Sequence, residues 1–302
     1  MHKIGIDLGG TKCEGVILNQ ANKEVYRERV PTHQENGYQA ILMTVQTLYN
    51  KLVQQLRGAS HTIGIGTPGS ISPKSGLMRN SNTLALNDKD LLNDLNDLIK
   101  HDLIVENDAN CFTLAEALLG EFKSDKLTFG VILGTGCGGG FVRDKRLMTG
   151  LTGNSGEWGH SSIDPDGPDC YCGKKGCVET YISGGGAQNR YFEMTGHQAT
   201  MEEIIQGYRD QKPPATEFMK QYFNWFGRAL SNVVNIIDPD IIIIGGGLSN
   251  MREIYNEGQT AFEQCIFSDY YPNKIQKNSL GDSAGVLGAA MLHTYKSKGS
   301  SL

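Results

Sequence analysis

One pattern of residues occurs twice in this chain and restricts the folds that it can adopt. Residues 3–18 read as a short apolar strand, a turn with two glycines and a second strand. Residues 127–142 repeat this order around a turn, 134–140, in which five of the seven residues are glycine. Short apolar runs bounded by glycine are typical of β-hairpins. We interpret the recurrence as an internal duplication, which predicts two related α/β halves.

The length and the remaining periodicity favour two domains. A chain of 302 residues is too long for a single small hydrophobic core, and this length is typical of two domains packed around a cleft. Several segments carry apolar side chains at helical spacing, and other short apolar runs read as strands. The expected helices are 37–57, 88–100, 111–119, 216–237, 252–267 and 284–293, and the expected further strands are 24–30, 62–67, 102–105 and 241–244.

Glycine-rich turns follow three of the expected strands. In residues 9–12 the glycines lie between two strands, whereas Walker and dinucleotide motifs lead into a helix. The backbone N–H groups of such a turn can approach nucleotide phosphates, and Asp7 ends the first strand beside it. Taken alone, an aspartate followed by two glycines fits a plain hairpin better. The nucleotide interpretation therefore depends on the further glycine turns at 134–140 and 245–247.

A polar cluster follows the strand expected at 102–105. Asp108 lies at the carboxyl end of that strand and near the start of a helix, where open α/β sheets bind ligands. The alternative is that Asp108 is a helix N-cap. Its neighbours Asn107 and Asn110 favour a functional role for Asp108 over a capping role, because an N-cap needs one oxygen, whereas orienting a sugar hydroxyl needs several groups. The polar loop that contains Asn82 can also face a polyol.

Residues 156–179 concentrate potential metal ligands. Cys170, Cys172 and Cys177 follow His160 and complete the Cys3His set that is typical of tetrahedral structural Zn²⁺. Buried cysteines would need an apolar periodicity that this segment, rich in Asp, Gly, Pro and Lys, does not have. A disulfide suits a secreted chain, but no leader segment precedes the first strand, and seven cysteines are an odd number.

A zinc ion would also position its surroundings. Gly173 and Gly176 can supply the tight bends that converging thiolates need. Glu157 lies three residues before the histidine, and Glu179 lies two residues after the last cysteine. We therefore expect the closed metal site to hold two carboxylates in place.

The composition argues against nucleic-acid and membrane partners. The net charge is −5, and the basic residues are scattered along the chain. No apolar run approaches the roughly 20 residues that span a bilayer, and no apolar leader precedes the first strand. We expect a cytoplasmic protein.

Six motifs in order give the chain a full-length resemblance to the ROK family of sugar kinases. They are Asp-Leu-Gly-Gly-Thr-Lys from residue 7, Asn-Asp-Ala-Asn from 107, Gly-Thr-Gly-Cys-Gly-Gly-Gly from 134, Gly-Glu-Trp-Gly-His from 156, Cys-Tyr-Cys-Gly-Lys-Lys-Gly-Cys-Val-Glu from 170, and Gly-Gly-Gly-Leu-Ser-Asn from 245. The resemblance implies a duplicated actin/hexokinase-like (ribonuclease H-like) fold whose two lobes close on ATP and a hexose. The N-terminal lobe would be 1–118 with the helix 284–295 returning to it, and the C-terminal lobe would be 119–283 with the zinc loop 156–179.

The resemblance also implies roles for individual residues. Asp108 would be the general base that accepts the proton of a hexose 6-hydroxyl as it attacks ATP bound with Mg²⁺. The sugar-binding residues would be Asn82, Asn107, Glu157, His160 and Glu179. The nucleotide-binding residues would be Asp7, Gly10, Thr11, Lys12, Gly134, Thr135, Gly136, Gly246 and Gly247. The zinc ligands would be His160, Cys170, Cys172 and Cys177, in agreement with their spacing.

The substrate expected from the resemblance is D-fructose. Residues 68–73, Trp158 and the run Cys-Tyr-Cys-Gly-Lys resemble the bacterial fructokinase or manno(fructo)kinase branch. The alternative is an N-acetyl-D-glucosamine, glucose or other hexose kinase of the same family. A non-catalytic sugar-responsive regulator is more remote: a ROK repressor has a helix-turn-helix before its first hairpin, and a silent sensor would lack the base or the glycine turns. A homodimer is the expected assembly.

Overall fold

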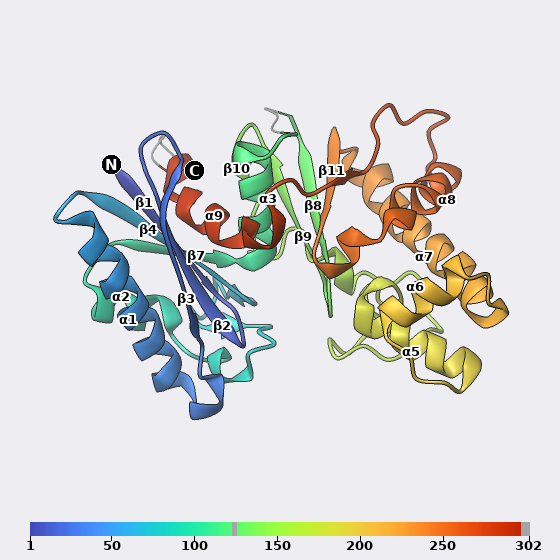
Figure 1. Ribbon diagram of the computed structural model, residues 1–302, viewed down its shortest axis with the longest axis horizontal. Helices are drawn as coiled ribbons and strands as arrows, with labels where there is room; N and C mark the ends of the chain where they lie inside the picture. The colour runs from blue at the N-terminus through green and yellow to red at the C-terminus, as the bar shows by residue number, and fades with distance from the viewer. Residues whose placement is uncertain (123–125, 297–302) are drawn as a thin grey trace. The chain divides into compact units, whose positions relative to one another are not determined.

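The chain forms two compact units in the computed structural model, which describes residues 1–122 and 126–296 (Figure 1). Unit 1 is Met1–Asp125, Gly140–Ser155 and Ser279–Leu302, and unit 2 is Lys126–Gly139 and Gly156–Asn278. The stretch 140–155 clusters with unit 1, whereas the division expected from the sequence places it in the C-terminal lobe. The lobe division itself stays a prediction.

A five-stranded sheet in the order β3-β2-β1-β4-β7 forms the centre of unit 1. β1 (His2–Leu8) and β2 (Lys12–Leu18) form the predicted antiparallel hairpin, which β3 (Glu24–Pro31) extends. β4 (His61–Thr67) runs parallel to β1, and β7 (Leu103–Asn107) runs parallel to β4. The carboxyl ends of these three parallel strands therefore meet at one edge of the sheet.

Apolar side chains at alternate strand positions face two predicted helices of unit 1. Ile4 and Ile6 of β1 pack in one cluster with the apolar stripes of α1 (Tyr38–Leu56) and α2 (Leu91–Ile99). Full burial of each large aliphatic side chain contributes roughly 1.5–3 kcal/mol. The residues buried against the sheet are the apolar residues that recur at helical spacing. This spacing therefore predicts both helices correctly.

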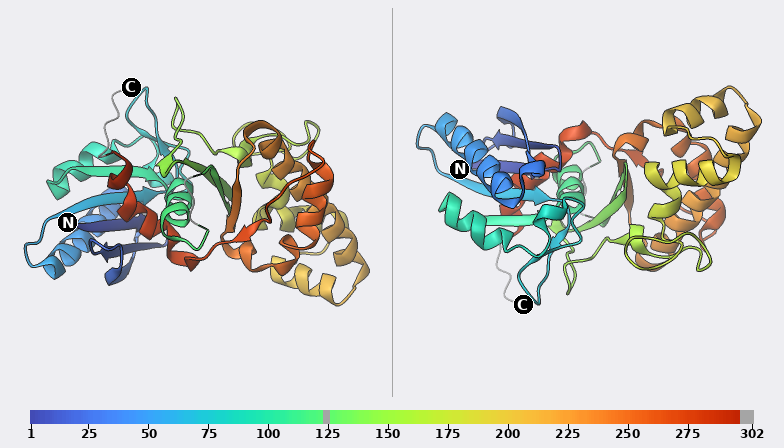
Figure 2. Two further views of the ribbon diagram at one scale, coloured as in Figure 1. Left: turned by 90° about the horizontal axis from the view of Figure 1, so that it is seen from above. Right: turned by 90° about the horizontal axis from the view of Figure 1, so that it is seen from below.

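Glycines on the other face of the sheet let a helix approach the strands closely. A Cβ atom at Gly5 or Gly64 would overlap a carbonyl oxygen of α9 (Ala284–Met291). A Cβ atom at Gly288 of α9 would overlap a carbonyl oxygen of α3 (Asp108–Leu119). Figures 1 and 2 show α9, drawn in red, beside α3. The helix expected over 284–293 is therefore present as α9, and its small residues let it pack closely against its neighbours.

The second sheet repeats the strand order of the first, in the order β10-β9-β8-β11-β12. β8 (Thr128–Leu133) and β9 (Cys137–Arg143) match the second predicted hairpin, and β10 (Arg146–Leu147) pairs antiparallel with β9. β11 (Ile241–Gly245) runs parallel to β8, and β12 (Gln276–Lys277) runs parallel to β11. The predicted duplicated α/β fold is confirmed.

Helices make up most of the remainder of unit 2. They are α4 (Glu179–Ile182), α5 (Gly184–Thr195), α6 (Met201–Arg209), α7 (Pro213–Ile237) and α8 (Glu257–Cys265). The long α7 begins within three residues of its predicted start and buries an aromatic stripe. None of the helices in the described parts of the chain combines the length and the apolar composition that a membrane crossing needs.

The single helix expected over 252–267 is instead split into η5 (Arg252–Ile254) and α8. Glu253 points inward, where the Arg209 guanidinium donates two hydrogen bonds to its carboxylate at 2.8 and 3.0 Å. Periodicity does not reveal such a contact. The remaining short elements are β5 (Ser70–Ile71), β6 (Met78–Arg79), α10 (His293–Lys296), η1 (Gln34–Asn36), η2 (Leu84–Leu86), η3 (Trp158–His160), η4 (Gly247–Asn250) and η6 (Gly281–Ser283).

Candidate active site and metal centre

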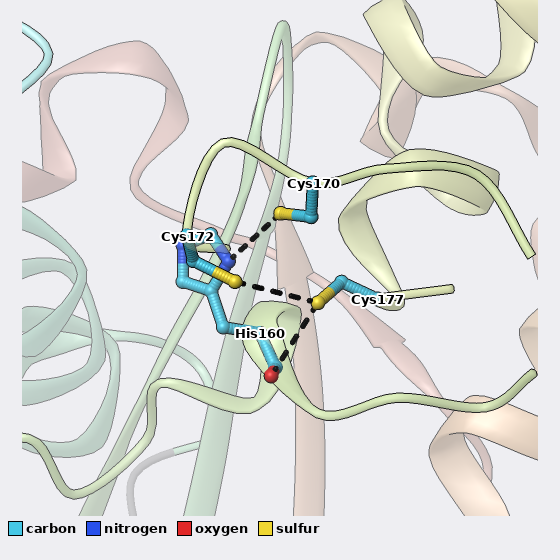
Figure 3. A group of neighbouring side chains, drawn as sticks. All are labelled: His160, Cys170, Cys172 and Cys177. Carbon is cyan, nitrogen blue, oxygen red and sulfur yellow. Dashed lines mark hydrogen bonds between the residues drawn. The ribbon is translucent and has the colours of Figure 1, made fainter. Parts of the chain in front are cut away.

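Four side chains of unit 2 meet in one cluster (Figure 3). The Sγ atom of Cys170 lies 3.6 Å from Nδ1 of His160, and the Sγ atoms of Cys172 and Cys177 are 3.6 Å apart. All four ligand atoms lie within 4.8 Å of one another. A tetrahedral Zn²⁺ with Zn–S distances of about 2.3 Å places two sulfurs about 3.8 Å apart. The donor set and its spacing therefore fit the metal that the sequence predicts.

Tight turns bring these ligands together. The backbone N–H of Cys170 donates to the carbonyl of Lys174 at 2.8 Å, and the N–H of Gly173 donates back to the carbonyl of Cys170 at 2.9 Å. Gly173 and Gly176 have φ angles of +87° and +62°, in the region that favours glycine. A Cβ atom at Gly176 would also overlap the carbonyl oxygen of Asp164. The two glycine bends expected between the ligands are present.

The second ring nitrogen of His160 already has a protein partner. Its Nε2 lies 2.9 Å from the hydroxyl of Tyr171, and the two rings meet edge to face with centroids 5.0 Å apart. Such an outer partner orients a metal-binding imidazole. The sequence alone suggests that this nitrogen binds a sugar hydroxyl, and Tyr171 is overlooked. The position of Tyr171 between Cys170 and Cys172 could have indicated a role beside the metal. Burial, and then the charge of Glu179, raises the pKa of Tyr171 to about 12, so its hydroxyl is neutral.

Two carboxylates lie close to the metal cluster. Glu157 directly precedes η3, and burial raises the pKa of its carboxyl, an effect to which the charge of Glu179 adds. Glu179 begins α4, and its Oε2 accepts a hydrogen bond from the backbone N–H of Cys137 at 2.9 Å. The two carboxylates are close enough to interact electrostatically. The structure therefore brings together two of the residues expected to bind the sugar.

The glycine turns of unit 2 lie at one edge of its sheet. Gly134 follows β8 and Gly246 follows β11, and these neighbouring strands are parallel. Within the first turn the N–H of Gly134 donates to the carbonyl of Gly136 at 3.0 Å. Gly246 has a φ of +81°, and a Cβ atom there would overlap the carbonyl oxygen of Leu133. Thr135 and Gly247 lie in the same two turns, so the structure brings the predicted phosphate-binding residues of this unit to one edge.

In unit 1 two aspartates interact at the carboxyl edge of the sheet. Asp7 is the penultimate residue of β1, and Asp108 directly follows β7. Burial, together with the charges of Asp108 and Glu14, raises the pKa of Asp7 to about 7, while Lys12 acts in the opposite direction. The residue expected to act as base and the first residue expected to bind the nucleotide therefore share one environment.

Glu14 is a third carboxylate beside this pair, and no motif in the sequence indicates it. It is the cross-strand partner of Asp7 in the β1–β2 hairpin and is buried. Although burial acts to raise its pKa, hydrogen bonds from Arg27 and Arg29 lower it below the ordinary value. The Arg29 Nε–Glu14 Oε2 distance is 3.0 Å. The pairing of β2 with β3 creates this ion-pair network, since it places Glu14 opposite Arg29, and only that register could have indicated it.

We expect Asp7→Asn to stabilise the ligand-free protein, and to do so more strongly at pH 8 than at pH 5. Folding raises the pKa of Asp7 from 3.8 to about 7. The folded state therefore loses stability as the pH rises from about 4 to about 7, because the unfolded chain releases this proton more easily. Asparagine does not ionise, so the variant does not lose this stability as the pH rises. Urea unfolding at both pH values measures the effect, with the exposed Asp97→Asn as the control. An equal effect at pH 5 and pH 8 would contradict the assigned shift.

Asn107, and not Asp108, is the N-cap of α3. Its side-chain oxygen accepts hydrogen bonds from the N–H groups of Ala109 at 2.9 Å and Asn110 at 3.3 Å. Its amide donates to the carbonyl of Gly69 at 3.1 Å. The alternative interpretation of Asp108 as the capping residue is therefore wrong.

The other expected site residues lie at the surface of unit 1. Thr11, Lys12 and Asn82 are exposed, and Gly10 is partly exposed in the β1–β2 turn. Unit 1 thus contains Asp7, Gly10, Thr11, Lys12, Asn82, Asn107 and Asp108, and unit 2 contains Gly134, Thr135, Gly136, Glu157, His160, Glu179, Gly246, Gly247 and the three cysteine ligands. The structure brings together residues within each of these two sets.

The chain matches known proteins over nearly its whole length. The sequence model described as "ROK family" matches residues 3–296. The N-acetyl-D-glucosamine kinases of Pectobacterium atrosepticum and Pasteurella multocida are 36% and 33% identical to it, over 96% and 97% of this chain and 98% and 100% of theirs. The solved ROK hexokinase from Thermus thermophilus has a TM-score of 0.90 at 26% identity and covers 99% of this chain and 100% of its own.

Proposed function

Because the chain belongs to the ROK family of sugar kinases, we propose that it transfers the γ-phosphoryl group of ATP to the 6-hydroxyl of N-acetyl-D-glucosamine. The relatives that are 33–36% identical over nearly the full chain are named for that sugar. Fructose, the substrate expected from the sequence motifs, has no such support. The alternative weighed from the sequence is therefore the better supported substrate.

The motifs that suggested fructose have evident structural roles. Trp158 is buried, its Nε1 donates to the carbonyl of Gly138 at 3.0 Å, and its ring packs edge-on against Phe129 with centroids 5.5 Å apart. Ser70 begins the short strand β5, where it pairs with Arg79. Residues with such roles report on the packing of the fold, and they are weak evidence about the sugar.

The observation that carries the proposal is the placement of Asp108. It directly follows a parallel strand, at the sheet edge where Asp7 and the first glycine turn also lie. Asn107 is the N-cap of α3. Asp108 Oδ1 also accepts the Ala109 N–H at 2.8 Å, but an amide oxygen could accept that bond equally, so the helix start does not require a carboxylate at this position. We assign to Asp108 the role of accepting the proton of the attacking hydroxyl. Phosphoryl transfer otherwise needs positioning and charge neutralisation, which glycine turns can supply.

We assign ATP to the glycine turns of the two sheets, where backbone N–H groups can face its phosphates. Mg²⁺, when bound to the triphosphate, neutralises part of its charge. The residues proposed to bind the nucleotide are Asp7, Gly10, Thr11, Lys12, Gly134, Thr135, Gly136, Gly246 and Gly247.

We assign the sugar hydroxyls to Asn82, Asn107, Glu157 and Glu179. His160, which the sequence also placed at the sugar, is assigned to the metal alone, because its two ring nitrogens face Cys170 and the Tyr171 hydroxyl. The Cys3His cluster would hold Zn²⁺, and four protein ligands would close its coordination, as in a structural site. When bound, zinc would tie together the loop between His160 and Cys177. The ordering of that loop places Glu157 and Glu179 at fixed positions beside the sugar.

A coupled assay of ADP release with a panel of sugars tests the proposal. With ATP and Mg²⁺ we expect kcat/KM to be highest for N-acetyl-D-glucosamine and at least about tenfold lower for fructose, glucose and mannose, because a site built to bind an N-acetyl group loses hydrogen bonds with sugars that lack it. Excess EDTA should abolish turnover. A preference for fructose would restore the original expectation, and no ADP release with any sugar would refute the kinase assignment.

A further inference from the structure

One carboxylate joins a glycine turn to the segment that follows the metal ligands. Glu179 starts α4, and its Oε2 accepts the hydrogen bond from the backbone N–H of Cys137 at 2.9 Å. A hydrogen bond from a backbone N–H to a carboxylate is stronger than one between neutral groups. The fit is close, because a Cβ atom at Gly136 would lie 2.8 Å from the same oxygen. The turn and the carboxylate therefore constrain each other.

Two further hydrogen bonds connect the same two parts of unit 2. The N–H of Gly184 donates to the carbonyl of Gly134 at 2.7 Å, and the N–H of Gly185 donates to the carbonyl of Thr135 at 3.2 Å. Both donors belong to the first turn of α5, where N–H groups have no partner within the helix. Gly134, Thr135 and Cys137 are thus each held by one hydrogen bond to the α4–α5 segment.

The backbone near the metal cluster holds Glu179 in turn. Cys177 pairs with Ser162 across an isolated β-bridge, and the N–H of Val178 donates to the carbonyl of Ser161 at 2.9 Å. The hydroxyl of Thr180 donates to the carbonyl of Cys177 at 2.7 Å. The backbone is therefore held on both sides of Glu179, at the point where the chain continues from the metal-binding loop into α4.

From these contacts we infer that Glu179 is a positioning residue for the glycine turn 134–136, in addition to its proposed place in the sugar site. Its Oε2 holds the N–H of Cys137 and thereby fixes the direction of the turn's backbone. In the proposed sugar site, its Oε1 would be the oxygen that binds the sugar. The inference rests on the proposed assignment of ATP to this turn. One carboxylate then connects the sugar side and the nucleotide side within unit 2.

Two substitutions of Glu179 separate these roles. The dissociation constant for ADP is measured by titration calorimetry on the metal-loaded full chain, without sugar. Glu179→Ala removes the acceptor, and we expect the ADP Kd to rise about ten- to a hundredfold. Glu179→Gln keeps a carbonyl oxygen for the Cys137 N–H, and we expect an ADP Kd within about threefold of wild type. The same Gln variant should bind N-acetyl-D-glucosamine at least about tenfold more weakly, since it lacks the charge.

The outcomes distinguish the inference from the proposed function. A wild-type ADP Kd in Glu179→Ala would overturn the positioning role, whatever the sugar result. Unchanged sugar binding in Glu179→Gln would overturn only the sugar assignment. The exposed Glu202→Gln on α6 serves as the control and should match wild type in both titrations. If the Ala variant lacks a cooperative thermal transition or its zinc, Glu179→Asp, whose carboxylate is one methylene shorter, replaces it with the same expected rise in ADP Kd.

Discussion

Replacing Asp108 with asparagine is expected to lower kcat by about 10²–10⁴-fold while the Kd of the sugar changes by no more than about threefold. Asparagine keeps the shape of the side chain and its capacity for hydrogen bonding, but it cannot accept the proton of the attacking hydroxyl. Because Asn107 caps α3, the substitution should leave the start of that helix in place. Steady-state kinetics and a titration with N-acetyl-D-glucosamine measure the two quantities separately.

Asp102→Asn provides the matched control for this substitution. Asp102 is exposed just before β7, so its replacement removes the same charge at the other end of the strand. We expect it to keep the wild-type kcat. Retention of most of the activity in Asp108→Asn would show that another group takes the proton, and equal losses in both variants would point to a general effect of charge.

Replacing Cys172 with serine is expected to release the metal and to raise the KM for the sugar at least about tenfold. A serine hydroxyl is a poor substitute for a thiolate, and the remaining three ligands cannot close a tetrahedral site. Cys172 is itself exposed, so the substitution leaves no large cavity in the core. Metal content measured by elemental analysis and KM measured by the coupled assay test the two parts of the expectation.

Cys265→Ser is the control, because Cys265 lies on α8 and is not among the four clustered ligands. It should keep both metal and KM. A Cys172→Ser protein that loses its metal and keeps the wild-type KM would break the connection between the metal and the sugar site. Full metal retention in the same variant would contradict the ligand set.

The parts of the fold that follow from local patterns were predicted from the sequence, and those that depend on tertiary contacts were not. Both hairpins and α1 follow from strand alternation and helical spacing. α5 was overlooked because it opens with three glycines, which are poor helix formers. It forms because Ser183 caps it and its first N–H groups bind the turn at 134–135. The split before α8 depends on the buried Glu253, whose partner lies 44 residues earlier.

The candidate site divides in the same way. The metal ligands lie within one short segment, so their chemistry is visible in the sequence, and the structure clusters them. The network of Glu14 with two arginines depends on strand register, which no single motif records. Trp158 is weak evidence about the sugar, because a buried tryptophan can be retained for packing alone. The homodimer, the cytoplasmic location and the absence of nucleic-acid and membrane partners stay predictions.

The identity of the phosphorylated product shows whether the enzyme transfers phosphate to the 6-hydroxyl of the sugar. After incubation of the enzyme with ATP, Mg²⁺ and N-acetyl-D-glucosamine, phosphorus NMR with proton coupling identifies the carbon that carries the phosphate. We expect one ester, in which the phosphorus couples to the two protons on C6, formed in equal amount to ADP. Phosphate on the anomeric carbon, or ADP released with inorganic phosphate and no sugar ester, would contradict it.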